Sequence, residues 1–280
     1  GTLSLGVDHR EESLDAEGYS VDSRYATGVY GSWHLQQQRH HVTTSLRYDD
    51  DNRYCHQMTG GSSYAYDLTA AQQLGASYSS AFKAPNLIDL YNPYGSGNPD
   101  LDAETSTTAE LFWRLQRHHW HLGLNAFQTD IDNLITYDQN AQTSYNVNKA
   151  RIQGIELSTG WKNYNLIIKT STTWQNPIDK TDNTQLSRRA KRFARIDVDY
   201  AFDDWSFGTT LRGSSRRDNS QYDDYKIAGY GVVDLRTSWQ VMPNVKLSAK
   251  LDNVFDREYQ LVNGYNTQGR YVEGGVTFFF

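Results

Sequence analysis

The sequence has no long hydrophobic run, and this absence excludes a helical membrane protein. Nowhere in its 280 residues is there a stretch approaching the roughly 20 consecutive apolar residues that a membrane-spanning helix needs. A membrane-spanning β-strand needs only about 10 residues, half of which are polar. The hydrophobic content of 38% and the net charge of −6 resemble those of a soluble, mildly acidic domain, but they do not exclude a transmembrane β-barrel.

Cysteine, proline and methionine are also scarce. The single cysteine, Cys55, excludes an intramolecular disulfide and a thiolate metal cluster, and we interpret it as an incidental thiol. Five prolines and two methionines stand against 20 tyrosines, 7 tryptophans and 10 phenylalanines. This balance favours a large sheet over helical packing, so an all-β fold is the first class to test.

Apolar and polar residues alternate with a period of two, most clearly in the last third of the chain. The apolar positions of four such segments are Ile196, Val198, Tyr200 and Phe202; Trp205, Phe207, Thr209 and Leu211; Val233, Leu235, Thr237, Trp239 and Val241; and Val245, Leu247, Ala249 and Leu251. Most residues between them are charged or small and polar. Each segment is therefore predicted to be a strand with one apolar and one polar face.

Short and long connections alternate between the predicted strands. The short turns lie at residues 37–39, 70–71, 117–118, 162–164, 203–204 and 242–244, and the long polar stretches at 10–22, 49–60, 84–103, 137–144, 176–187, 217–227 and 260–269. This pattern is typical of antiparallel up-and-down transmembrane β-barrels, which have short periplasmic turns and long external loops. We predict about fourteen strands, an even number that puts both ends of the segment on the periplasmic side.

A soluble sandwich or propeller is the alternative fold, since alternation with turns suits those folds too. The predicted strands, however, often exceed the usual soluble length of about 5 to 6 residues. The chain also ends with Val272, Val276, Phe278 and the terminal Phe280 on one strand face. Such an end resembles the sorting signal read by the outer-membrane assembly machinery, whereas in a soluble protein it would be an exposed edge prone to aggregation. We therefore expect a Gram-negative outer-membrane protein.

Three segments resemble motifs of the TonB-dependent outer-membrane receptors, in order and spacing. Residues 79–91 resemble S-x-x-F-[KR]-A-P-x-L-x-x-L-Y, residues 98–105 resemble N-P-x-L-x-P-E-x with Ala103 in place of the proline, and residues 251–259 resemble x-x-N-L-F-D-K-x-Y. Pro85 and Pro99 lack an amide donor and are expected to end strands. Asn253 and Asp256 are expected to bind backbone groups at a strand end. We interpret all three motifs as architectural.

Within the family, the resemblance is greatest to the cobalamin-uptake receptors. Residues 148–156 resemble the K-A-R-I-K-G-V-E strand of those receptors, residues 186–191 their L-L-R-R-A-K motif and residues 264–270 their G-Y-Q-T-A-G-R motif. The resemblance implies cobalamin as the ligand, with Arg188 and Tyr222 as substrate-binding residues. An arginine would donate hydrogen bonds to carbonyl or phosphate oxygens, and a tyrosine would stack on the corrin edge or donate to it. A siderophore receptor for a ferric chelate is the alternative within the family.

The resemblance also implies what lies outside the segment. Family barrels have about 22 strands, so residues 1–280 would be the C-terminal portion of the barrel, without the plug domain and the segment that recruits TonB. The strand-like pattern that opens the chain at residues 2–7 leaves no signal peptide, so we expect a mature or truncated piece. No cofactor is expected here, although loops missing from the segment carry calcium in the cobalamin receptors. Whether the segment closes into a smaller pore stays open.

Other functions fit the sequence less well. An outer-membrane enzyme would need a catalytic set at one level of the barrel, but His40, His41, His118, His119 and His121 lie at predicted periplasmic turns, where we also expect no metal site. A passive porin remains a further alternative. The basic run at residues 188–195 would face the lumen or lipopolysaccharide phosphates rather than nucleic acid, since the overall charge is negative. We expect a monomer.

Overall fold

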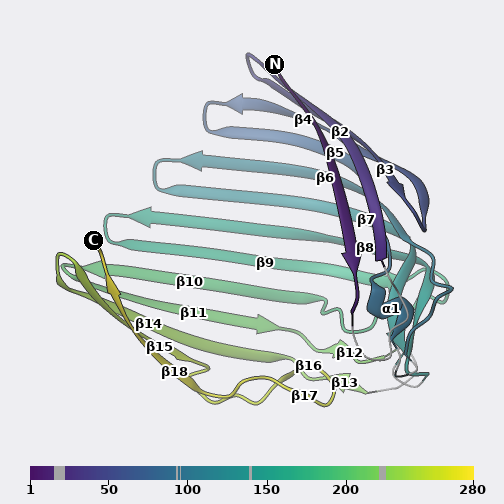
Figure 1. Cartoon of the computed structure of the whole chain (residues 1–280). Coiled ribbons are helices and arrows are strands. Elements are labelled where there is room, and N and C mark those ends of the chain that lie inside the picture. The colour runs from purple at the N-terminus through teal and green to yellow at the C-terminus, as the bar shows by residue number, and fades with distance from the viewer. Residues whose placement is uncertain (16–22, 93, 95, 139–140, 221–224) are drawn as a thin grey trace. The chain divides into compact units, whose positions relative to one another are not determined.

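A computed structural model shows an antiparallel, up-and-down β-structure (Figure 1). The structure describes residues 1–15, 23–92, 94, 96–138, 141–220 and 225–280. Within these residues, no helix has both the length and the apolar character required to cross a membrane. The all-β prediction is confirmed.

Fourteen strands form the main sheet, and the strands follow one another in chain order. They are β1 (Thr2–Ser13), β2 (Ser23–Gln37), β3 (His40–Asp51), β4 (Cys55–Thr69), β5 (Gln72–Lys83), β6 (Glu104–Arg117), β7 (Trp120–Asp138), β8 (Thr143–Asn163), β9 (Leu166–Asp179), β10 (Arg192–Phe202), β11 (Trp205–Ser214), β14 (Tyr230–Met242), β15 (Val245–Asp252) and β18 (Tyr271–Phe278). The predicted number of strands is therefore confirmed. The loops contain the helix α1 (Leu87–Tyr91) and two small hairpins, β12 (Arg217–Asp218) with β13 (Lys226–Ile227) and β16 (Gln260–Val262) with β17 (Tyr265–Asn266).

The six predicted short turns all connect consecutive strands, and four of them use a left-handed residue. Gln38, His118, Tyr164 and Asp203 have φ values of 54°, 22°, 41° and 49°. Tight hairpins favour positive φ at the turn, because this backbone twist matches the twist of the flanking strands. Each turn therefore closes a hairpin even though glycine is absent from these four positions.

One predicted loop is wrong. The polar stretch 49–60 belongs almost entirely to β3 and β4, which pair as far as Asp51 and Cys55 and leave only residues 52–54 as a turn. The acidic run is accommodated in the ladder because its carboxylates have partners. Arg47 binds Asp49, and the carboxylate of Asp51 accepts the backbone amides of Arg53 and Tyr54.

The chain divides into two compact units, which we describe separately. The first unit comprises Gly1–Trp113, Ala126–Gln153 and Asn176–Leu186, and the second comprises Arg114–Asn125, Gly154–Gln175 and Ser187–Phe280. A small cluster of buried side chains in the first unit, Leu134, Val147, Ala150 and Leu186, lies where β7 and β8 approach the loop after β9.

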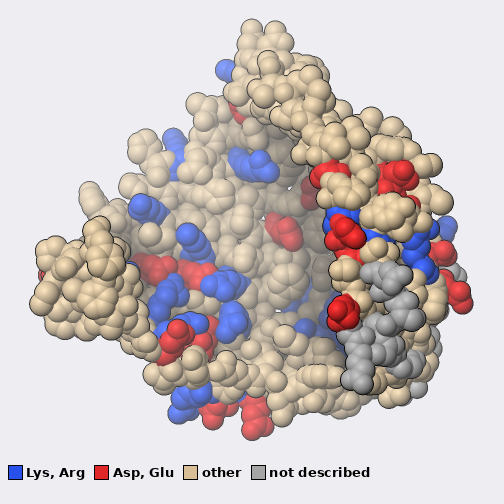
Figure 2. All heavy atoms as spheres, viewed as in Figure 1, with Lys and Arg blue, Asp and Glu red and all other residues tan. Residues whose placement is uncertain are grey.

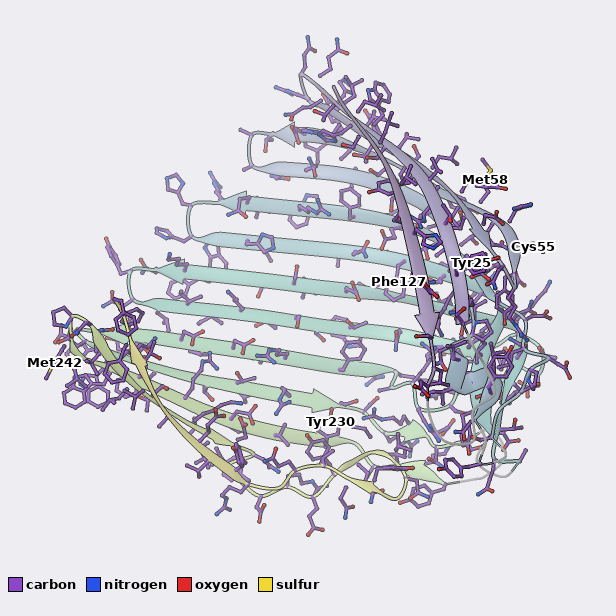
Figure 3. All side chains as sticks on the ribbon, in the orientation of Figure 1. Tyr25, Cys55, Met58, Phe127, Tyr230 and Met242 are labelled. Carbon is purple, nitrogen blue, oxygen red and sulfur yellow. The ribbon has the colours of Figure 1, made fainter. Side chains whose placement is uncertain are left out.

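Both units carry exposed apolar side chains on one face of their strands. Leu3, Leu5 and Val7 of β1 are 65%, 75% and 70% exposed, and Val272, Val276 and Phe278 of β18 are also exposed. Side chains stand on both faces of the strands, and the labelled Met58 projects outward (Figure 3). Contiguous apolar surface of this extent is unfavourable in water and is the surface that a transmembrane strand presents to lipid.

Candidate functional site

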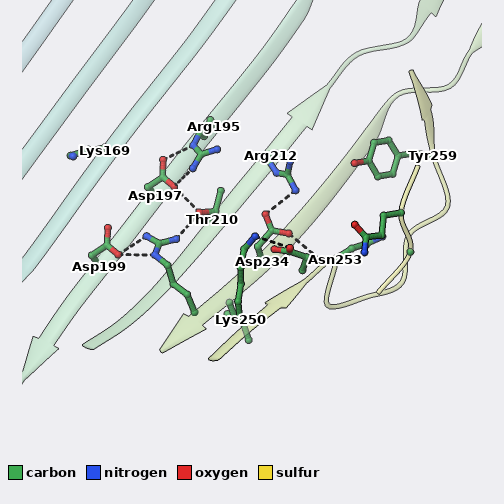
Figure 4. A pocket seen from close by; sticks show the side chains of 15 residues that line it. Lys169, Arg195, Asp197, Asp199, Thr210, Arg212, Asp234, Lys250, Asn253 and Tyr259 are labelled. Carbon is green, nitrogen blue, oxygen red and sulfur yellow. Dashed lines mark hydrogen bonds and ion pairs between the residues drawn. The ribbon is translucent and has the colours of Figure 1, made fainter. Parts of the chain in front are cut away.

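The polar face of β9, β10, β11, β14 and β15 in the second unit carries a dense array of charged side chains, shown in close-up in Figure 4. Register brings them together, because Asp197 lies opposite Lys169 on one side and Thr210 on the other, and Thr210 lies opposite Asp234. The array lines a cavity of about 710 Å³, which we call the charged cavity. Figure 2 shows basic and acidic side chains interspersed on the viewed face of the molecule.

Each carboxylate of the charged cavity is paired with a cation. The pairs are Arg195 with Asp197 (2.7 Å), Arg212 with Asp234 (2.9 Å), Lys250 with Asp252 (2.7 Å) and Arg236 with Asp199. Exposed ion pairs of this kind contribute only about 0 to 1 kcal/mol each to stability. The array therefore does more to fix the positions of charges than to stabilise the sheet.

Five cations and four carboxylates line the charged cavity, so one cation is in excess. Lys169 is the side chain left over, and it has no ion-pair partner in the part of the chain that the structure describes. Asp197, which lies directly opposite, is engaged by Arg195 and accepts a hydrogen bond from the Thr210 hydroxyl at 2.6 Å. The cavity thus offers a free ammonium group beside four neutralised pairs.

Glycine makes room for one of these pairs. Arg236 on β14 reaches Asp199 on β10 by crossing the intervening strand β11 at Gly208. A β-carbon at Gly208 would lie 2.4 Å from Nε of Arg236, closer than real contacts allow. The absence of a side chain at this position is therefore required for the ion pair to span three strands.

A second cavity, of about 460 Å³, lies among the loops of the same unit, and we call it the loop cavity. Its walls include Tyr259 and Gly269, which also line the charged cavity. The ring of Tyr259 stacks on Tyr230 with centroids 4.2 Å apart, and the guanidinium of Arg217 lies 5.8 Å from the Tyr230 ring.

The motif at residues 251–259 holds this loop in place. The side chain of buried Asn253 donates to the carbonyl of Arg257 (2.9 Å) and accepts from its amide (2.8 Å). Asp256 accepts the amide of Arg270 at 2.7 Å, which ties the start of the loop to its end. The expectation that Asn253 and Asp256 bind backbone groups is confirmed.

The other two motifs fasten the loop between β5 and β6 in the first unit. Arg24 donates to the carbonyl of Pro85 at 2.5 Å, and Arg53 donates to the carbonyl of Pro99. The hydroxyl of Tyr54 donates to the carbonyl of Leu101 at 3.2 Å, and burial raises the pKa of this phenol. The architectural interpretation of these motifs is therefore supported by the contacts that they make.

The structure describes one of the two predicted binding residues. Arg188 lies in the loop before β10 with φ of 59°, and its amide donates to the carbonyl of Asp218 at 2.7 Å. Its Nε is buried and has no hydrogen-bond partner among the residues that the structure describes, and Arg188 does not line the charged cavity or the loop cavity. Tyr222 lies outside the described residues.

The sequence predicted neither a cavity wall at Tyr259 nor the charged cavity. The signal was present, because charged residues alternate with apolar ones at Arg195, Asp197 and Asp199 on β10 and at Asp234 and Arg236 on β14. Only the strand register shows that these positions meet on one face.

Comparison with known proteins agrees with this architecture. The family model described as "TonB dependent receptor-like, beta-barrel" matches residues 4–254. The solved structures that resemble the chain include the copper transporter OprC, at 22% identity and a TM-score of 0.78, with 99% of this chain and 53% of that one covered. The ferric enterobactin receptor PfeA of Pseudomonas aeruginosa matches at 21% identity and a TM-score of 0.80, with 99% and 50% covered. The siderophore receptor PirA of Acinetobacter baumannii matches at 18% identity and a TM-score of 0.78, with 99% and 52% covered. The chain thus spans about half the length of these proteins.

Proposed function

The chain belongs to the TonB-dependent receptor β-barrel family, and on this premise we propose that it is part of an active-transport receptor for cobalamin. Membership implies the outer membrane of a Gram-negative bacterium, and the family and its structural neighbours are transport receptors rather than enzymes. The exposed apolar face of the strands suits lipid, and the charged opposite face suits a polar ligand.

Three short segments support cobalamin as the ligand, namely residues 148–156, 186–191 and 264–270, which resemble motifs of the cobalamin receptors. Cobalamin carries amides around its corrin ring and a phosphate in its nucleotide tail. A guanidinium donor such as Nε of Arg188, a buried atom with no hydrogen-bond partner in the described part of the chain, suits these oxygens. We retain Arg188 and Tyr222 as proposed contacts.

A ferric siderophore is the second candidate ligand, because PfeA and PirA are named as receptors for ferric enterobactin and for a siderophore. Titrating the full-length receptor with cyanocobalamin and, separately, with ferric enterobactin separates the two. We expect saturable binding of cyanocobalamin, and energy-dependent uptake that an uncoupler of the proton gradient abolishes. Saturable binding of the ferric chelate alone would favour the siderophore receptor, and non-saturable flux of both would indicate a porin.

Replacing Arg188 tests the proposed contact. We expect Arg188→Ala to weaken cyanocobalamin binding about tenfold, because a charged hydrogen bond is worth about 1.5 to 3 kcal/mol. Arg192→Ala, an exposed arginine on the same segment, is the matched control and should leave the Kd unchanged. Equal affinities of the two variants would contradict the assignment.

The same proposal includes the position of this chain within the receptor and the partners of the receptor. We place residues 1–280 in the C-terminal portion of the barrel, with a plug domain and the TonB contact elsewhere in the protein. The assembly machinery would read the end at Phe280, and lipopolysaccharide would surround a monomeric barrel. Calcium would bind only to loops outside this segment.

A further inference from the structure

Two neighbouring short turns of the second unit concentrate positive charge in a chain whose net charge is −6. One turn joins β6 to β7, the other joins β8 to β9, and the two hairpins are adjacent in the sheet (Figure 1). Residues 114–121 and 160–166 contain three arginines or lysines, three histidines and no aspartate or glutamate. The amide of Lys162 donates to the carbonyl of His119 at 2.9 Å, and Nδ1 of His119 donates to the carbonyl of Lys162 at 2.7 Å. The two turns therefore form one surface, which we call the basic turn surface.

An arginine of the basic turn surface lies on the apolar face of the strands. Alternation along β6 places Arg117 on the same face as Leu111, which is 63% exposed, and alternation along β7 places Trp120 with Leu124, which is 44% exposed. Only residues 118–119 separate the two strands. Arg117 and Trp120 are therefore opposite each other across the hairpin, and paired residues share a face.

A second tryptophan extends this face onto β8. Trp161 alternates in phase with the exposed Ile155, and its ring centroid lies 6.2 Å from that of Trp120. The opposite face is marked by His121, whose Nδ1 donates to Oε1 of Gln116 at 3.0 Å. The guanidinium and the two indoles thus occupy the end of the apolar face, where the strands turn.

The charges of this surface suit a phosphate group. Arg117 and Lys162 are exposed, and neither forms an ion pair with a residue that the structure describes. A guanidinium binds phosphate oxygens through paired N–H donors, and indole rings favour the depth of the lipid headgroups. Short turns lie on the periplasmic side of such barrels, so this surface meets the headgroups of the periplasmic leaflet.

A second tryptophan pair at the same end of the strands shows what is particular to the first. Trp205 and Trp239 are paired across β11 and β14 with ring centroids 5.1 Å apart, but the turn beside them contains Asp203 and Asp204. A girdle of aromatic residues at the membrane interface accounts for both pairs. It does not account for the opposite charges of their turns, which favour different headgroups.

We propose that Arg117, Trp120 and Trp161 bind an anionic phospholipid of the periplasmic leaflet. The guanidinium holds the headgroup phosphate, and the two indoles pack against the glycerol backbone and the first acyl carbons. Lys162 adds a positive charge that favours a headgroup without an ammonium group. The proposal depends on the location of the chain in the outer membrane and not on the identity of the transported ligand.

Quenching of tryptophan fluorescence tests the proposal in the full-length receptor, reconstituted in phosphatidylcholine nanodiscs. Part of the lipid is replaced by phosphatidylglycerol or by phosphatidylethanolamine, each with brominated acyl chains that quench nearby indoles. The signal lost in the Trp120→Phe/Trp161→Phe variant isolates the first pair, and that lost in Trp205→Phe/Trp239→Phe isolates the control pair. We expect the first pair to require about fivefold less phosphatidylglycerol than phosphatidylethanolamine for half-quenching, since a cation near an anionic surface contributes about 1 kcal/mol. The control pair should show no preference for phosphatidylglycerol.

Substitution of the arginine tests its role in this preference. Arg117→Gln should bring the two lipids within about twofold of each other at the first pair, whereas Arg117→Lys keeps the charge and should keep most of the preference. Arg39→Gln removes an exposed cation from another short turn and should leave the preference unchanged.

Three results would overturn the lipid site. They are equal quenching of the first pair by both lipids in the wild type, an equal loss of preference in Arg39→Gln and Arg117→Gln, and quenching by neither lipid, which would place the pair outside the bilayer and favour a protein partner. A receptor that shows the lipid preference but does not bind cyanocobalamin would contradict the proposed function alone.

Discussion

The polar faces of the two units are built differently around the same ion-pair device. In each, an arginine crosses a glycine of the neighbouring strand to reach an aspartate on the next. Arg47 passes Gly28 to bind Asp8 in the first unit, as Arg236 passes Gly208 to bind Asp199 in the second. Such a pair links three strands and holds their register at one level of the sheet.

The surroundings of the two devices differ. Beside Arg47, small residues face one another across five strands, in the row Ser4, Ser32, Ser45, Gly61 and Ser79, over a hollow of about 530 Å³. Beside Arg236, five cations and four carboxylates line the charged cavity. The first unit also has charges around Arg47, where four cations and four carboxylates line a cavity of about 380 Å³, but the hydroxyl row lies beside them. Both faces therefore fix charges, and they differ in the hydroxyl row beside Arg47 and in the one cation by which the charged cavity exceeds its carboxylates.

The largest expected effect comes from filling the glycine gaps. Gly208→Val would place a β-carbon 2.4 Å from Nε of Arg236 and 2.7 Å from its Cγ, whereas Gly28→Val would meet the mobile end of Arg47 at 2.0 Å. We expect Gly208→Val to cost about 1 to 3 kcal/mol, as overpacking does, and Gly28→Val to cost less because a guanidinium moves aside more easily than a side-chain stem. The thermal transition of the folded receptor in detergent measures both.

Gly213→Val on β11 provides the control for that pair of variants, since its β-carbon would meet nothing closer than 3.6 Å. The free energy of unfolding of this variant should lie within about 0.5 kcal/mol of that of the wild type. Equal destabilisation at Gly28 and Gly208 would show that the two devices do not differ in rigidity.

An intermediate effect is expected from removing one arginine on each face. Arg212→Gln takes a donor from the charged cavity and should lower cobalamin uptake about fivefold, or about 1 kcal/mol. Arg47→Gln also breaks an ion pair, but it should leave uptake within about twofold, because the described cations and carboxylates around Arg47 are equal in number and leave no cation in excess, unlike those of the charged cavity. Initial rates of uptake are the measurement, and an equal loss in both variants would break the comparison.

The smallest expected effect concerns the loops. Asp182 accepts the amide and the hydroxyl of Thr184, and these hydrogen bonds hold the pKa of the carboxyl below its usual range. The ionised carboxylate accepts these hydrogen bonds, so the turn is fully stabilised when the pH lies above the ordinary carboxyl pKa of about 4. This stabilisation is lost as the pH falls through the lowered pKa. Hydrogen exchange should therefore show earlier opening of residues 181–185 in acid, and Asp182→Asn should remove this pH dependence. The hydrogen bond from the Arg270 amide to Asp256 closes a longer loop, so Asp256→Ala, which removes the acceptor, should loosen residues 253–270 together.

The fold was largely predictable because alternation and turns are local signals. The strands β10, β11, β14 and β15 follow the periodic segments, and the tight turns fall where the sequence places them. The polar run at 49–60 was wrongly predicted to be a loop, because acidic residues can remain in a strand when their carboxylates are paired. The charged cavity was not predictable, since a one-residue shift in register would separate Asp197 from Thr210. The substrate-binding role of Arg188 was inferred from a resemblance to the cobalamin receptors. Its contacts in the loop do not test that role, which stays a prediction.

The fastened loop between β5 and β6 also determines which antibodies will recognise the native protein. Pro85 and Leu90 are fully buried there, and Leu87 and Leu101 are nearly so, whereas the ring of Tyr94 is 88% exposed. Antibodies raised against a linear peptide of residues 84–91 would bind side chains that the folded chain conceals, and they would detect denatured protein on a blot while missing intact cells. A serum that labels living cells through this loop must recognise exposed side chains, such as those of Ile88 and Tyr94.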